Sequence, residues 1–117
     1  ASIEPLRIGP PPEARVMIAR TWHGVTPASK ADEYLEFLKK TGVKDYRATM
    51  GNRGVFVLRK VSEDRADFLL LSLWDEVEGI RRFAGPDAEK AFYYPEDEDF
   101  LLEFEPVVTH HEVLVGP

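Results

Sequence analysis

Apolar residues recur along this chain with two periods, one typical of strands and one typical of helices. Segments rich in β-branched and aromatic residues predict four strands, and segments with apolar residues at helical spacing predict two main helices. The strands are expected at 16–23, 55–61, 67–74 and 106–115, and the helices at 26–42 and 75–85. The order is β-α-β-β-α-β, which is the ferredoxin-like arrangement. We therefore expect an α+β domain with one antiparallel four-stranded sheet and both main helices on the same face.

Capping residues suggest where the two helices begin and end. Thr26 is expected to cap the first helix, with Pro27 at its first position and Gly42 at its left-handed exit. Asp75 is expected to cap the second helix, and Gly85 to end it.

The remaining segments carry weaker patterns. Residues 1–15 contain four prolines and predict an extended arm ahead of a single domain that spans 16–117. Residues 43–54 contain two glycines in their second half and read as a long connection. Residues 86–94 read as a further short helix, ended by Pro95.

The segment 67–74 is apolar on both faces rather than alternating. Phe68, Leu70 and Trp74 point one way, and Leu69, Leu71 and Leu73 point the other. Helices can cover one face of such a sheet, so the second face needs another cover. An extended arm is too narrow for that purpose. We therefore expect a homodimer in which two sheets pack face to face.

Composition narrows the function classes. The chain has 117 residues and a net charge of −6, and most of the negative charge lies in residues 75–117. The acidic run PEDEDFLLEFEP is expected to be a solvated face. Without a basic stripe or a long apolar run, we expect no nucleic-acid partner and no membrane attachment. The absence of cysteine leaves no thiolate metal site, and fits a cytoplasmic protein.

Four stretches together resemble the antibiotic-biosynthesis-monooxygenase-like family of dimeric α+β barrels. They are IARTWHG, LSLWDEVEGIRRFAG, FYYPED and VVTHHEV, and the likeness covers residues 16–115. The resemblance implies a ligand pocket between the sheet and the helices of each subunit. It also implies activities that range from cofactor-independent oxygenation of phenols and quinols to haem degradation.

The family's site residues are only partly present. Haem-degrading members use an Asn, a Trp and a His, and the corresponding positions here are Thr21, Phe83 and Tyr93. Haem is therefore disfavoured, and we expect no cofactor. The quinone-forming oxygenases resemble this chain more, because they place a Trp where Trp74 stands, although their nearby Asn is replaced by Leu70.

Histidines are the candidate bases. If Thr21 faces the helices, alternation places His23 at the mouth of the pocket and turns Arg20 and Trp22 toward the dimer partner. His23 could then remove a phenolic proton, or it could simply bond backbone or water at a strand end. The neighbouring His110 and His111 must point to opposite faces, so they make a poor metal site. By resemblance, His110 is the pocket candidate.

Aromatic residues and one loop residue complete the candidate site. The aromatic group is Trp74, Phe83, Phe92, Tyr93 and Tyr94. Such a group either sandwiches a planar ligand or fills a core, and each tyrosine hydroxyl needs a hydrogen-bond partner. Asn52 lies in a glycine-containing turn at a rim of the expected pocket.

The function expected from these features is cofactor-independent oxygenation of a small phenolic or quinol compound. His23 or His110 would act as the base, while Trp74 and Tyr93 would position the ring. Thr21, Leu70, Phe83, Phe92, Tyr94 and Asn52 would line the substrate. The alternative is a non-catalytic protein that binds a small aromatic molecule, and a third option is a haem-binding protein that uses a strand histidine.

Overall fold

The structure, a computed structural model, describes residues 17–116 and contains the expected sheet. The expected arm at 1–15 lies outside the described residues. The strands are β1 (Met17–Pro27), β2 (Asn52–Ser62), β3 (Arg65–Trp74) and β4 (Thr109–Val113). They form one sheet in the order β2-β3-β1-β4, and the paired strands are antiparallel. This order confirms the ferredoxin-like α+β fold.

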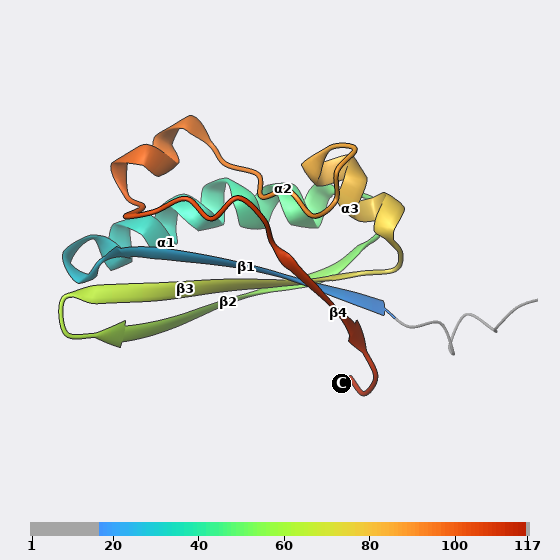
Figure 1. Cartoon of the computed structure of the whole chain (residues 1–117), viewed down its shortest axis with the longest axis horizontal. Coiled ribbons are helices and arrows are strands. Elements are labelled where there is room, and N and C mark those ends of the chain that lie inside the picture. Colours follow the sequence, from blue (N-terminus) through green and yellow to red (C-terminus); the bar gives the residue numbers. More distant parts are fainter. Residues whose placement is uncertain (1–16, 117) are drawn as a thin grey trace, which may run out of the picture.

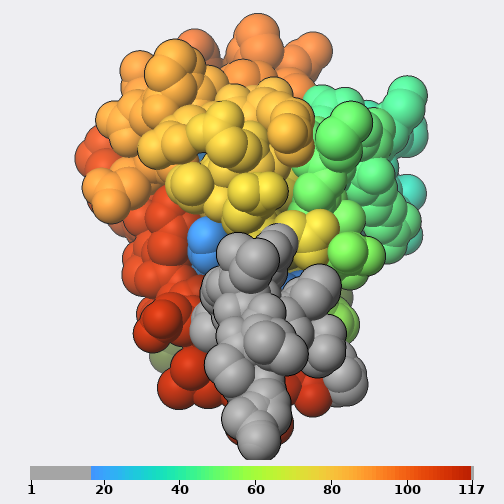
Figure 2. Space-filling model, turned by 90° about the vertical axis from the view of Figure 1, so that its right-hand side faces the viewer, coloured from blue at the N-terminus to red at the C-terminus, as the bar shows by residue number. Residues whose placement is uncertain are grey.

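All helices of the described chain lie on one face of this sheet (Figure 1). The first connection contains a short 3₁₀ turn, η3 (Ala28–Lys30), and two helices, α1 (Ala31–Lys40) and α2 (Gly42–Ala48). The second contains α3 (Val77–Ala84) and a 3₁₀ helix, η4 (Pro95–Asp99). Figure 2 shows α3 (yellow) beside the green residues around the start of β2 and the orange segment that follows α3.

The core lies between the sheet and the helices. On β3 every second residue from Ala66 to Trp74 is buried, and the residues between them are partly exposed. The expected division of β3 into two apolar faces is therefore confirmed. The opposite face carries Leu69, Leu71 and Leu73, with Phe56 and Leu58 of β2 beside them in the register. Phe56 and Leu58 are exposed, so this face is apolar and open in the described chain.

Several expected boundaries are wrong because long-range pairing overrides local signals. Thr26 and Pro27 do not start a helix, since β1 pairs with β3 as far as Pro27. Gly42 opens α2 rather than ending α1, so most of the expected loop at 43–54 is helix and strand. Asp75 bonds Arg53 at 2.7 Å instead of capping α3. Gly85 does end α3 as expected, with a positive φ of 98°.

Residues 86–94 do not form the expected helix. Their backbone bonds the strand-like segment before β4 instead: Ala91 N–H donates to the Pro106 carbonyl, and Val108 N–H donates to the Glu89 carbonyl, both at 2.9 Å. Pro95 begins η4 rather than ending a helix, and a proline suits a first helical position.

Candidate functional site

A small cavity lies between the sheet and the helix layer. Its volume is about 20 Å³, which is room for about one water molecule. Most of its wall is aromatic. The lining residues are Trp22, Tyr34, Leu38, Gly42, Tyr46, Leu70, Phe83, Phe92, Tyr94 and Asp97. Phe83 is partly exposed and Phe92 is 42% exposed, so these two rings form the outer part of the wall.

A buried arginine stands beside this cavity. The side chain of Arg20 is on the helix-facing side of β1, and the residue is only 1% exposed. Its guanidinium carbon lies 5.8 Å from the ring centre of Tyr46 and 5.6 Å from that of Phe83, and both rings line the cavity. Nη1 donates to the Tyr46 hydroxyl at 2.5 Å, and Nη2 donates to the Lys90 carbonyl at 3.2 Å.

Arg20 has no carboxylate partner within ion-pair distance among residues 17–116. Burial lowers its pKa, although an arginine stays charged at neutral pH. Burial also raises the pKa of Tyr46, more strongly than the neighbouring Arg20 lowers it, so Tyr46 remains a neutral hydroxyl. The charge of Arg20 is therefore not neutralised by Tyr46 or by an acidic side chain of the described chain.

Three buried nitrogen atoms on this side of the sheet have no hydrogen-bond partner in the described structure. They are Nε of Arg20, Nε1 of Trp22 and Nε2 of His110. Arg20 and His110 are paired across β1 and β4, and Trp22 follows Arg20 on the same face of β1. The indole of Trp22 lies edge-on to the ring of Tyr93, with the ring centres 6.1 Å apart. Burial and then the charge of Arg20 lower the pKa of His110, so its imidazole is neutral at pH 7.

A buried carboxylate forms part of the cavity wall. Asp97 is 3% exposed; its Oδ1 accepts from the Tyr34 hydroxyl at 3.0 Å, and its Oδ2 accepts from the Tyr94 N–H at 2.7 Å. Burial raises the pKa of Asp97, against the lowering effect of these two bonds. The expectation that the acidic run is solvated is therefore wrong for Asp97, which holds η4 against α1.

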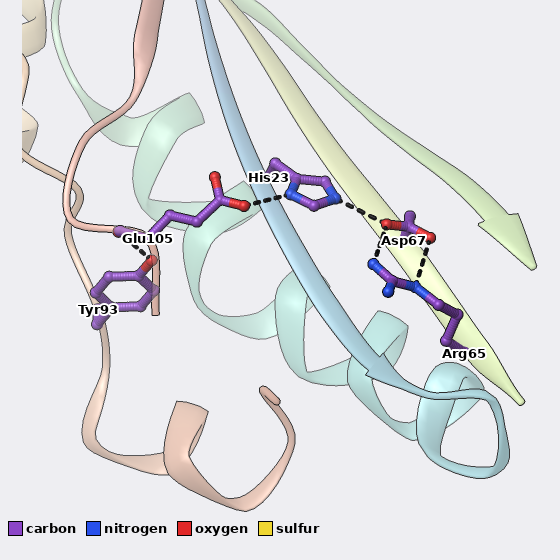
Figure 3. Close-up of polar contacts among 5 residues, drawn as sticks. All are labelled: His23, Arg65, Asp67, Tyr93 and Glu105. Atoms are coloured by element: carbon purple, nitrogen blue, oxygen red, sulfur yellow. Dashed lines mark hydrogen bonds and ion pairs between the residues drawn. The ribbon is translucent and has the colours of Figure 1, made fainter. Parts of the chain in front are cut away.

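His23 occupies a different place from the one expected. It pairs with Leu69 across β1 and β3 and points to the open face, away from the cavity. Nδ1 lies 2.6 Å from Glu105 Oε2, and Nε2 lies 2.9 Å from Asp67 Oδ1 (Figure 3). These carboxylates, Glu105 first, raise the pKa of His23 despite its partial burial. A histidine held between two carboxylates tends to stay protonated, which makes it a poor proton acceptor.

The faces expected for β1 are thus reversed. Trp22 lies opposite Leu70 and faces the helices, while Thr21 and His23 face the open side. Thr21 donates to the Thr109 carbonyl at 3.3 Å and does not line the cavity. Arg20, expected to face the dimer partner, faces the helices and bonds Tyr46 instead.

The cavity brings together four of the expected substrate-lining residues, namely Leu70, Phe83, Phe92 and Tyr94. Trp74 is fully buried, donates from its indole to Ser72 Oγ at 2.8 Å, and does not line the cavity. Tyr93 donates to the Glu105 carbonyl at 2.6 Å outside the cavity wall (Figure 3). The Asn52 side chain bonds the backbone of Gly54 within its own turn.

Five residues at or beside the cavity are not among the site residues expected from the sequence, namely Arg20, Trp22, Tyr34, Tyr46 and Asp97. For Tyr46 a signal existed, because Val43 and Tyr46 are three residues apart, at helical spacing. Their burial on one side of α2 follows that spacing. For Asp97 no signal existed, since nothing distinguishes it within the run PEDED.

No cluster of three or more metal-ligating side chains occurs in residues 17–116. A haem is much larger than the cavity and would have to separate the helix layer from the sheet to enter it. No helix of the described chain is long and apolar enough to span a membrane.

Comparison with known proteins finds a similarity in fold but none in sequence family. No family model and no curated protein matches its sequence. Among solved structures it is similar to the NE2512 protein of unknown function from Nitrosomonas europaea, with a TM-score of 0.58 and 13% sequence identity. The match covers 88% of this chain and 94% of that one, so the two share an α+β fold over nearly their full lengths.

Proposed function

We propose that this protein binds a small aromatic compound, a phenol or a quinol, in the cavity between the sheet and the helices. The observation that carries the proposal is the aromatic wall of that cavity, next to a buried arginine with unused donors. Ligand sites are typically apolar and aromatic, with a few polar groups that fix orientation. Here Trp22, Tyr46 and Phe83 provide the rings, and Arg20 provides the polar group.

The cavity must widen to accept a ring. Phe92 forms part of its wall, is 42% exposed and stands in the segment between α3 and η4 that has no regular helix. Rotation of this partly exposed side chain requires no break in a helix or in the sheet. A ligand would therefore enter past Phe92 and occupy the space next to Leu70 and Tyr46.

Titration with hydroquinone, followed by backbone NMR, tests this proposal. We expect saturable shifts around Gly42, Tyr46 and Leu70. Leu70→Phe should fill the cavity and weaken binding on the order of tenfold, while Leu71→Phe adds the same group on the opposite face and should leave binding unchanged. Shifts confined to the open face, or no saturable binding of hydroquinone or phenol, would contradict the proposal.

A second candidate function is oxygenation of the bound phenol, and His110 favours it. Its neutral imidazole has an unpartnered buried Nε2 beside the cation Arg20. His110 would remove the phenolic proton, and Arg20 would stabilise the phenolate. The electron-rich ring would then reduce O₂, and the phenol and O₂ would give a quinone and one water molecule.

Oxygen uptake with phenol or hydroquinone tests this second candidate. His110→Gln should abolish uptake, and His111→Gln, a matched change on the other face of β4, should not. Equal uptake by the two variants would exclude His110 as the base.

We further propose a homodimer through the open sheet face. Leu69, Leu71, Leu73, Phe56 and Leu58 form an apolar surface that the described chain does not cover. A second copy of the same surface matches it in chemistry and extent, because a two-fold axis places identical patches together. The cavity lies on the opposite side of each sheet and would stay accessible.

A further inference from the structure

The donors around Arg20 specify more about the ligand than the aromatic wall does. An arginine has five N–H groups, and the two hydrogen bonds of Arg20 use two of them. Nε makes no bond at all. The partners of Arg20 are a neutral hydroxyl and a backbone carbonyl, so neither removes its charge.

Such an arrangement is unfavourable in a protein interior. A buried charge is normally paired, because transfer from water to a protein interior disfavours an isolated ion. The rings of Tyr46 and Phe83 lie at cation–π distance and compensate for part of this effect. They do not satisfy Nε, which remains an unpartnered donor in a residue that is 1% exposed.

The neighbouring groups point to the same ligand chemistry. Trp22 Nε1 can only donate, and it is unpartnered and buried. His110 Nε2 lies on the same face and can donate or accept, depending on its tautomer. Asp97, the carboxylate that lines the cavity, already accepts hydrogen bonds from Tyr34 and Tyr94. An oxygen anion near Arg20 would thus find free donors there.

We propose that the ligand of this cavity carries an oxygen anion on its ring, a carboxylate or a phenolate, and that Arg20 binds that anion. This inference rests on the proposed function, because it uses the same cavity. Arg20 would supply Nε and a free Nη hydrogen to the anion, while Tyr46 holds the guanidinium in position. The ring would then lie against Phe83 and Leu70.

Isosteric probes of different charge test this assignment. Benzoate and benzamide have nearly the same shape, and 4-nitrophenolate supplies the phenolate form. Titrations followed by backbone NMR at neutral pH should show that one or both anions bind on the order of tenfold or more tightly than benzamide, as a charged hydrogen bond provides. Binding of only one anion would identify which of the two groups the site accepts.

Variants of Arg20 complete the test. In Arg20→Gln the anions and benzamide should bind with about equal affinity. Arg20→Lys should retain part of the preference for the anions because it keeps the positive charge. If Arg20→Gln fails to fold, the wild-type comparison and Arg20→Lys still decide the question.

The outcomes separate the two proposals. Equal binding of benzamide and both anions to the wild type would overturn the anion assignment and leave the aromatic site intact. If none of the three probes binds, both proposals fail. An unchanged anion preference in Arg20→Gln would show that another group recognises the charge and would exclude Arg20.

Discussion

The Nδ1 atom of His23 lies 2.6 Å from Oε2 of Glu105, and this contact joins β1 to the segment that leads into β4. On its other side His23 contacts Asp67 of β3, which also bonds Arg65 (Figure 3). One imidazole therefore links three parts of the chain that are distant in sequence. Its charge state decides how strongly they are held together.

The pKa shift of His23 predicts a pH-dependent stability. Its folded-state pKa is raised above the ordinary 6.5. The stabilisation is therefore complete below about pH 6.5 and is lost as the pH rises through the folded-state pKa. The side chain is 35% exposed, so solvent screening limits the effect to below about 1 kcal/mol.

Urea unfolding of the wild type and His23→Gln at a series of pH values measures this effect. The two proteins should differ most near pH 6 and converge above the raised pKa. His111→Gln, on the same open face at β4, serves as the control and should follow the wild type. If the difference in unfolding free energy between wild type and His23→Gln grew with rising pH, it would contradict a stabilising role of protonated His23.

The sequence predicted the fold well because the signals for it are spread over many residues. The apolar run in β3, helical spacing in α1 and the glycine after α3 each identify an element independently. For β1, the sequence leaves one choice: either the even-numbered or the odd-numbered residues face the helices. Each of these two faces carries one basic side chain, Arg20 or His23. Polarity therefore did not decide between the two faces, and the choice that turned Arg20 and Trp22 toward the dimer partner was wrong, since both are buried against the helices.

The candidate site was predicted less well than the fold, because the burial of single polar residues leaves no pattern in the sequence. The four expected residues that line the cavity are apolar or aromatic, and the burial of Leu70 follows from its spacing along β3. The polar groups that distinguish the site, Arg20 and Asp97, are buried against their usual tendency. Their partners come from residues 26 and 63 positions away, respectively, and a single sequence does not show such contacts.

Loss of the Asp97 carboxylate should destabilise the helix layer. Asp97→Ala leaves the buried Tyr34 hydroxyl and the partly buried Tyr94 N–H without their acceptor. Each unsatisfied buried group costs about 1–3 kcal/mol, so the free energy of unfolding should fall by about 2 kcal/mol or more. Asp99→Ala, two residues along in the same 3₁₀ helix and exposed, is the control and should change stability by less than about 0.5 kcal/mol. Equal urea midpoints for the two variants would contradict the role assigned to Asp97.

Substitution on the open face should dissociate the proposed dimer. Leu71→Glu places a carboxylate in the middle of the apolar surface, where a second sheet would bury it without a partner. Leu102→Glu adds the same charge at a side chain that is 60% exposed and outside the sheet. Light scattering with size-exclusion chromatography should show a monomer for the first variant and a dimer for the second. A wild-type monomer at high protein concentration would refute the dimer itself.

Two helical glycines face different surroundings, and alanine should have opposite effects at them. A Cβ at Gly79 would lie 3.0 Å from Trp74 Cε3 and 3.1 Å from the Met50 carbonyl oxygen, so α3 would have to move away from the sheet. A Cβ at Gly42 would meet Leu70 Cδ2 at an ordinary 3.7 Å. Gly79→Ala should therefore destabilise the fold by about 1–3 kcal/mol, as overpacking does.

Gly42→Ala should leave stability unchanged or raise it by up to about 1 kcal/mol, because alanine favours a helix. Gly42 also lines the cavity, so its new methyl group would occupy space that the proposed ligand needs. The same variant should thus weaken hydroquinone binding while the urea midpoint holds or rises. Weaker binding together with lower stability would indicate general disruption of the helix layer, whereas full binding affinity in a stable Gly42→Ala protein would place the ligand elsewhere.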